Sequence, residues 1–79
     1  MSLSTACAYL EKLMELQSFS AASKVLGITQ PSLSSYIKKL ENQYQLHILQ
    51  RKTQPLLFTH EGKELLAYLQ QALLLERMF

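Results

Sequence analysis

The stretch SFSAASKVLGITQPSLSSYIKKLEN, residues 18–42, decides the fold. Its first part has apolar residues at helical spacing as far as Leu26, and Ser20 is expected to cap this short helix by accepting hydrogen bonds from free amides. Gly27 can adopt the left-handed conformation that ends a helix, and Ile28 follows as a buried anchor. The stretch therefore begins with a short helix over residues 21–26 and a tight turn at residues 27–29.

A second helix is predicted from a cap at Thr29 to about residue 43. Pro31 stands in its first turn, where the missing amide hydrogen has no cost. One side is apolar through Leu33, Ile37 and Leu40, and the other carries serines near its start, although an ordinary solvated side favours Glu, Lys and Gln. Two such helices joined by a tight turn match the helix-turn-helix plan, whose second helix enters the major groove of DNA.

The flanking segments predict a wing and two more helices. Residues 4–16 have helical spacing, with Ser4 or Thr5 as the N-cap. Residues 46–58 are interpreted as two short strands with a polar tip, although Pro55 limits the pairing of the second strand. Thr59 is expected to cap a last helix from His60 towards residue 78. The fold class is therefore mainly α, a winged helix-turn-helix with a three-helix core, a two-stranded β-hairpin wing and a long C-terminal linker helix.

This pattern divides the chain into a winged helix-turn-helix domain over residues 1–58 and a linker helix over residues 59–79. Inside the first part we expect Ala22, Val25 and Leu26 to point inward, with Phe19 filling the core. Cys7 is expected to be a small core residue. Gly62 is a poor helix former, so its presence early in the last helix indicates close packing.

The last helix is apolar on several sides, more than one small domain can cover. We expect it to form the interface of a homodimer. The seam residues predicted from its stripe are Leu65, Leu66, Leu69, Ala72, Leu73 and Glu76. Further apolar residues on its other sides are Tyr68, Leu74, Leu75, Met78 and Phe79.

Charge and composition exclude several classes of protein. Between residues 20 and 59 five cations face one glutamate, a net charge of +4, whereas the flanks are mildly acidic, which suits a protein that presents one face to a polyanion. A single cysteine, Cys7, excludes an internal disulfide, and with His47 and His60 it lacks the ligand spacing of a zinc site. With no paired nucleophile and base and no phosphate-cradling loop, we predict no enzyme activity, no cofactor and no metal. The chain also lacks a membrane-crossing apolar run or a secretory signal, and we expect it to be cytoplasmic.

The residues also carry a family resemblance over residues 9–75. The strings SFSAA at residues 18–22 and LGITQPSLS at residues 26–34, followed by Ile37 and by Leu40-Glu41, resemble the signature of bacterial LysR-type regulators. Arg51 and the string FTHEG at residues 58–62 are similar to the wing and linker-helix start of that family. The resemblance implies a dimer whose last helices pack antiparallel, with two reading heads on a partly inverted-repeat operator of double-stranded DNA.

The resemblance also assigns roles to single residues. It implies that Gln30, Pro31, Ser34 and Ser35 contact bases and that Arg51 contacts the DNA backbone. Gln30 can pair bidentately with adenine, and Pro31 offers an apolar contact to a thymine methyl group. The full set of expected DNA-backbone contacts is Ser20, Thr29, Ser32, Lys38, Arg51, Lys52, Gln54 and Thr59.

The sequence departs from the family pattern at four positions. Ser35 and Gln54 stand where arginine is frequent, which predicts fewer charged contacts with DNA. Gln45 replaces a usual glycine and Leu49 a usual phenylalanine, so the angle of the wing is left open. Family members usually continue into a ligand-sensing domain that this sequence lacks, so we expect a fragment that binds DNA and senses no small-molecule inducer itself.

The main prediction is therefore sequence-specific DNA binding as a homodimer for transcriptional regulation. A second hypothesis is a winged-helix protein-protein interaction module that uses the apolar C-terminal helix, because a fold alone does not fix a function. Contacts with phosphates impose a steep salt dependence that an interaction module lacks. Salt dependence of binding to duplex DNA therefore separates the two hypotheses.

Overall fold

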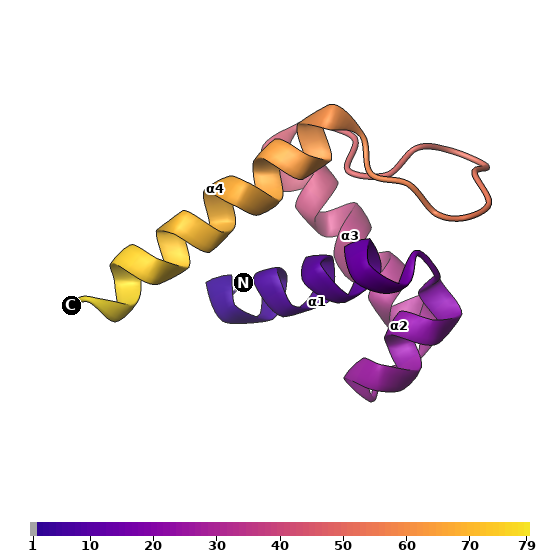
Figure 1. The fold of residues 1–79 in the computed structure, drawn as a ribbon, viewed down its shortest axis with the longest axis horizontal. Helices are drawn as coiled ribbons and strands as arrows, with labels where there is room; N and C mark the ends of the chain where they lie inside the picture. The colour runs from indigo at the N-terminus through magenta and orange to yellow at the C-terminus, as the bar shows by residue number, and fades with distance from the viewer. Residues whose placement is uncertain (1) are drawn as a thin grey trace.

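The structure, a computed structural model, describes residues 2–79 and contains four α-helices in this range (Figure 1). They are α1 (Leu3–Leu16), α2 (Phe19–Leu26), α3 (Gln30–Tyr44) and α4 (His60–Arg77). α1 packs against both α2 and α4, and α2 packs against α3. The segment between α3 and α4 extends away from the helices as a loop, and the start of α1 lies on the same side of the molecule as the second half of α4 (Figure 1). No helix in residues 2–79 combines the length and the apolar character needed to span a bilayer.

Side-chain caps set where the helices begin. Thr29 accepts a hydrogen bond from the Ser32 amide, with Pro31 in the first turn of α3, and Thr59 caps α4, so both predictions are confirmed. The N-cap of α1 is Ser2, so the prediction of Ser4 or Thr5 was wrong.

The predicted cap of the short helix α2 was also wrong. Ser18, in an extended conformation, accepts from the Ala21 amide at 3.1 Å and is the N-cap, whereas Ser20 already lies inside the helix. Gly27 ends α2 in the left-handed conformation at φ 72°, as predicted. Because α2 begins two residues earlier than expected, Phe19 is its first residue and not a connection.

The core is one apolar cluster to which all four helices and the wing contribute, with Leu10, Leu33, Leu40, Ile48 and Leu69 almost completely buried. The buried residues Ala22 and Cys7 confirm two core predictions.

Val25 is 61% exposed, so its predicted inward position was wrong. The buried side of α2 is centred on Ala22 and Ser23, and the Ser23 hydroxyl is satisfied by the Ser20 carbonyl at 3.0 Å. Val25 lies outside this buried side of α2 and faces solvent. Phe19 and Ile28, both expected in the core, are half-buried against it.

The wing, defined here as residues 46–58, is held by few backbone pairs. In the described chain its strand pairing reduces to an isolated antiparallel bridge between Leu49 and Phe58, so the two-stranded hairpin is not confirmed. The Gln50 amide donates to the Leu57 carbonyl at 2.9 Å, but the Leu57 amide donates to the Thr53 hydroxyl. A side chain thus takes the place of a strand partner, and Pro55 has no amide hydrogen to offer.

Candidate nucleic-acid interface

The start of α3 presents the four predicted base-contacting residues to solvent. Gln30, Pro31 and Ser35 are exposed and Ser34 is half-buried. Leu33, Ile37 and Leu40 anchor the opposite side of α3, each at most 2% exposed. The polar side of the helix is therefore free of its own chain, and its backbone is held rigidly by the core.

A groove separates α3 from the wing and joins the basic residues of both. Its volume is about 470 Å³. Ser34 and Lys38 line it from α3, Arg51 and Lys52 line it from the wing, and Phe19 contributes from α2. The remaining lining residues are Ile37, Glu41, His47, Leu49, Gln50 and Leu56. The wing cations and the polar side of α3 thus share one concave surface.

Two adjoining hollows extend this surface around the start of α3. One, of about 500 Å³, is lined by Phe19, Gln30, Pro31 and Ser34. The other, of about 240 Å³, brings Ser20 and Gln54 close to Gln30. Residues that are far apart in the sequence are therefore neighbours along one face.

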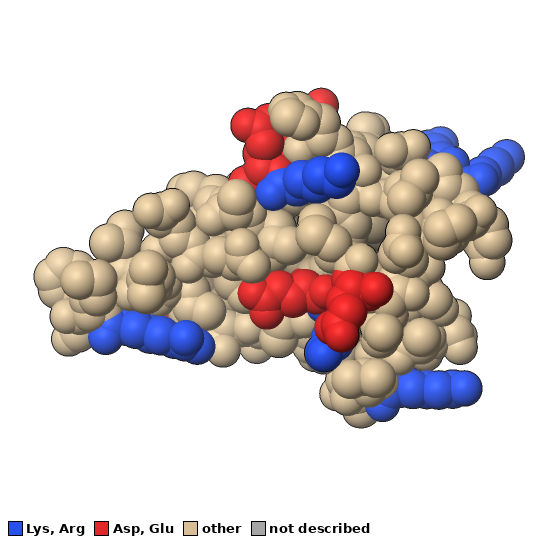
Figure 2. Space-filling model, viewed as in Figure 1, with Lys and Arg blue, Asp and Glu red and all other residues tan. Residues whose placement is uncertain are grey.

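The charge is distributed unevenly over the molecule. Figure 2 shows Lys and Arg side chains projecting at the end where Figure 1 places the wing and α2, with a further basic side chain near the end of α4. Acidic side chains lie over the middle of the same view and along its upper edge (Figure 2). An extended polyanion is attracted most strongly to the end that carries the wing.

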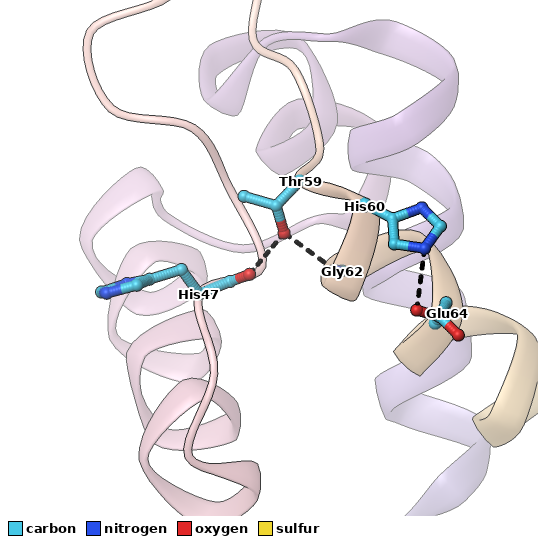
Figure 3. Close-up of polar contacts among 5 residues, drawn as sticks. All are labelled: His47, Thr59, His60, Gly62 and Glu64. Carbon is cyan, nitrogen blue, oxygen red and sulfur yellow. Dashed lines mark hydrogen bonds and ion pairs between the residues drawn. The ribbon is translucent and has the colours of Figure 1, made fainter.

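Two expected DNA-backbone contacts use their hydroxyl groups within the chain. Thr59 donates to the His47 carbonyl and accepts from the Gly62 amide at 2.9 Å, which ties the base of the wing to α4 (Figure 3). Thr29 donates to the Ser32 hydroxyl at 2.8 Å. On α4, Nε2 of His60 lies 3.0 Å from Oε1 of Glu64 (Figure 3).

Two residues that hold the wing were missed by the sequence analysis. Gln17 ends α1 with a left-handed backbone, its carbonyl accepts from the Leu56 amide at 3.0 Å, and its side-chain amide donates back to the Leu56 carbonyl at 3.5 Å. Glu41 accepts from the Ile48 amide at 2.7 Å. Glu41 could have been singled out from the sequence, because it is the one acidic residue among the basic residues 20–59.

The predicted dimer seam divides into two parts. Leu65, Leu66 and Leu69 are at most 5% exposed and belong to the core that α4 forms with α1, so they are not available to a second copy. Ala72 and Leu73 are half-buried and Glu76 is exposed. The exposed large apolar residues of α4 and its end are Tyr68, Leu74, Leu75, Met78 and Phe79.

Comparisons with solved structures agree with this fold. The domain BenM DBD, solved with benA site 1 DNA, matches with a TM-score of 0.83 and 33% identity over 99% of this chain and 88% of that chain. VV2_1132, a LysR family transcriptional regulator, matches with a TM-score of 0.85 and 27% identity over 98% of this chain and 28% of that chain.

Sequence comparisons give the same family. The transcriptional regulator YbhD of Escherichia coli K12, itself uncharacterized, is 43% identical over 54 residues, which are 68% of this chain and 17% of YbhD. The regulator ArgP of Aeromonas salmonicida is 42% identical over 67 residues, which are 85% of this chain and 22% of ArgP. The chain thus spans about a fifth of the length of these relatives. The model of the family "Bacterial regulatory helix-turn-helix protein, lysR family" matches residues 5–63, and the chain therefore belongs to the lysR family.

Proposed function

We propose that this chain binds double-stranded DNA sequence-specifically as a homodimer and thereby regulates transcription. The observation that carries the proposal is the exposed start of α3, where Gln30, Pro31 and Ser35 are free of their own chain. Gln30 and Pro31 share a hollow with Ser34, which also lines the groove that holds Arg51 and Lys52, whereas Ser35 lines a separate hollow with Pro31 and Lys39. A rigid helix with short polar side chains, flanked by cations, has the shape and charge to enter a major groove.

The residue types suggest how the contacts are divided. Gln30 offers a donor and an acceptor to adenine, and Pro31 offers an apolar surface to a thymine methyl group, whereas Ser34 and Ser35 discriminate less between bases. Arg51, Lys52 and Lys38 neutralise phosphates. The other DNA-backbone contacts proposed are Ser20, Thr29, Ser32, Gln54 and Thr59.

Relatives support the DNA part of the proposal. The BenM DBD was solved with DNA, and so was DarR of Vibrio fischeri, which is 25% identical to this chain with a TM-score of 0.78. The homodimer is supported by the exposed apolar residues at the end of α4, among them Leu74 and Leu75. An inverted-repeat operator would match the twofold symmetry of such a dimer.

The test begins with selection of bound sequences from a random pool of duplexes. Fluorescence anisotropy then measures the affinity of each variant for the selected operator and for random DNA. Gln30→Ala should weaken operator binding by about 1–3 kcal/mol and relax the choice of base at one position, whereas Arg51→Ala should weaken binding to both duplexes equally. Gln43→Ala, an exposed glutamine near the other end of α3, is the matched control and should change neither affinity.

Two outcomes contradict the proposal. Equal losses on operator and random DNA for Gln30→Ala would remove its base-reading role. Binding of the wild-type chain to DNA that is absent, or insensitive to salt, would instead favour a protein-interaction module built on the apolar end of α4.

A further inference from the structure

The backbone of Ile48 connects the wing to two helices, through its amide and its carbonyl group. Ile48 opens the wing and its side chain is 0% exposed. Its amide donates to Oε2 of Glu41, on α3, at 2.7 Å. Its carbonyl accepts from the Thr59 amide at 2.9 Å, at the start of α4. Among the described residues, Glu41 thus supplies the side-chain hydrogen bond from α3 to the wing.

The α4 side of this connection is closely packed. A Cβ atom added at Gly62 would lie 2.3 Å from the Ile48 carbonyl oxygen, so α4 and the wing backbone are in direct contact. The Glu41 carboxylate holds the amide group of the same residue. Ile48 is therefore fixed relative to α3 and α4 together.

This attachment determines where the wing cations stand. Arg51 and Lys52 follow Ile48 by three and four residues, and the isolated bridge of the wing lies next to Ile48, at Leu49. With so little pairing further out, the direction of the wing depends on its base.

The position of Glu41 is electrostatically unfavourable for DNA binding. Glu41 lines the groove that Lys38, Arg51 and Lys52 also line. A DNA phosphate backbone would enter this groove. A carboxylate there repels phosphates and partly neutralises the cations. The hydrogen bond that the Glu41 carboxylate accepts from the Ile48 amide explains why an acidic residue stands in this groove.

We propose that Glu41 is a positioning residue for DNA binding, whose carboxylate fixes the base of the wing so that Arg51 and Lys52 stand opposite the base-facing side of α3. This inference rests on the proposed DNA-binding function. Glu41 favours DNA binding through the hydrogen bond that it accepts from the Ile48 amide, whereas its negative charge alone disfavours DNA binding.

The test compares three substitutions at Glu41 in the complete chain. Glu41→Ala removes both hydrogen bond and charge. Glu41→Gln keeps an acceptor oxygen for the Ile48 amide without the charge. Glu41→Asp keeps the charge on a side chain one methylene shorter. Glu64→Ala is the matched control, because it removes the same charge from an exposed position whose partner is the exposed His60.

The readout is the salt dependence of affinity for the selected operator and for random duplex. The slope of log affinity against log salt falls in magnitude by about 0.9 for each phosphate that the protein no longer neutralises. Glu41→Ala and Glu41→Asp should lower the magnitude by about 1.8 for each bound protomer, because Arg51 and Lys52 would no longer reach their phosphates, and should leave the operator-to-random ratio within about twofold. Glu41→Gln and Glu64→Ala should keep the wild-type slope, with Glu41→Gln binding at least as tightly as wild type.

A second experiment, in a variant that already lacks the two wing cations, distinguishes a positioning role of Glu41 from a general loss of structure. With Arg51→Ala and Lys52→Ala already present, Glu41→Ala should not lower the slope further. If Glu41→Ala fails to fold, as judged by circular dichroism, the comparison of Glu41→Asp with Glu41→Gln makes the same distinction. An unchanged slope in Glu41→Ala or Glu41→Asp, or a slope in Glu41→Gln as low as theirs, overturns the inference. A wild-type chain that does not bind DNA overturns the proposed function instead.

Discussion

Tyr36 carries a hydroxyl group that is buried without a hydrogen-bond partner among the described residues. Its ring packs edge-on against that of Tyr9, with centroids 4.7 Å apart. A buried polar group without a partner costs free energy, because it loses water and gains nothing in return. The packing of the ring, rather than the hydroxyl, is therefore the contribution of Tyr36 to stability.

Removing this hydroxyl should stabilise the fold. Tyr36→Phe keeps the ring contacts and should raise the free energy of unfolding by about 1 kcal/mol. Urea denaturation followed by circular dichroism measures the change. Tyr68→Phe is the control, because Tyr68 is 59% exposed and its hydroxyl is free to meet water. A loss of stability in Tyr36→Phe would mean that the hydroxyl is bonded in solution.

Cys7 links stability to pH. Burial raises the pKa of its thiol above the ordinary value of 9.0, the negative charge of Glu11 raises it further, and Arg77 opposes both. The unfolded chain therefore releases the thiol proton at a lower pH than the folded one. The contribution of the thiol to stability is complete below about pH 9 and is lost as the pH rises through the unfolded value towards the folded one.

The expected outcome is a fall in the free energy of unfolding as the pH rises above about 9. Cys7→Ala should lower stability at neutral pH through poorer packing but should make this alkaline fall shallower. Denaturation in urea at several pH values, with a reducing agent present, measures both effects. Identical pH profiles for the two proteins would show that the thiol is not responsible. Burial raises the pKa of Tyr36 as well, so part of the fall should remain in the variant.

At the scale of the elements, α4 has a glycine in its first turn, Gly62, which helix propensity alone would not choose. Gly62→Ala should gain about 1 kcal/mol from propensity, yet its new Cβ would lie 2.3 Å from the Ile48 carbonyl oxygen, which is backbone and cannot move aside freely. We expect a net loss of about 1–3 kcal/mol in the free energy of unfolding.

Ala67→Gly is the control for this prediction, because Ala67 is an exposed position of the same helix. It should cost about 1 kcal/mol, which measures propensity without the steric contact. Thermal unfolding gives both values. A Gly62→Ala variant more stable than wild type would mean that α4 and the wing are further apart than in the structure.

The elements show how far the sequence could predict this fold. Helical spacing and turn residues predicted all four helices and the caps Thr29 and Thr59. The caps of α1 and α2 were misassigned because each stretch offers two serines, and a serine can also lie inside the first turn of a helix. The strands of the wing were overpredicted, since apolar runs on either side of a polar tip do not reveal that Thr53 takes the Leu57 amide hydrogen.

The angle of the wing, left open by the sequence, depends on a backbone conformation. Gln45 replaces a usual glycine at the end of α3, yet it adopts the left-handed conformation itself, at φ 56°. Its side-chain amide donates to the Asn42 carbonyl at 2.6 Å. The chain therefore turns at this point without a glycine. The contacts of Gln17 and Glu41 with the wing could not be predicted, because they join residues whose proximity only the complete fold creates.

At the scale of the whole molecule, α4 has two roles along its length. Its first half fills the core through Leu65, Leu66 and Leu69, and its second half carries exposed apolar residues. The sequence could not separate these roles, since a leucine stripe has the same spacing whether it meets α1 or a second copy. Only the position of α1 against α4 divides the two halves.

The exposed half makes a prediction about association. Leu74 and Leu75 are 60% and 53% exposed, and burying a leucine is worth about 1.5–3 kcal/mol. Replacing both with glutamate should therefore raise the dimer dissociation constant by about a hundredfold or more. Analytical ultracentrifugation over a range of concentrations measures it.

Val25→Glu is the matched control, because Val25 is similarly exposed at 61% but lies on α2. It should leave the dissociation constant unchanged. A wild-type chain that is monomeric at high concentration, or a double variant that still forms the dimer, would contradict the proposed dimer through α4.

The wing is hydrogen-bonded to the helices through Gln17, Glu41 and Thr59. Its outermost residues at positions 51, 52, 54 and 55 are exposed. Mutations there have few native interactions to break, so natural variation can add or remove cations at the tip with little effect on folding. Under the proposed function, such a chain can acquire or lose general affinity for DNA independently of its choice of bases, and the two properties can evolve separately.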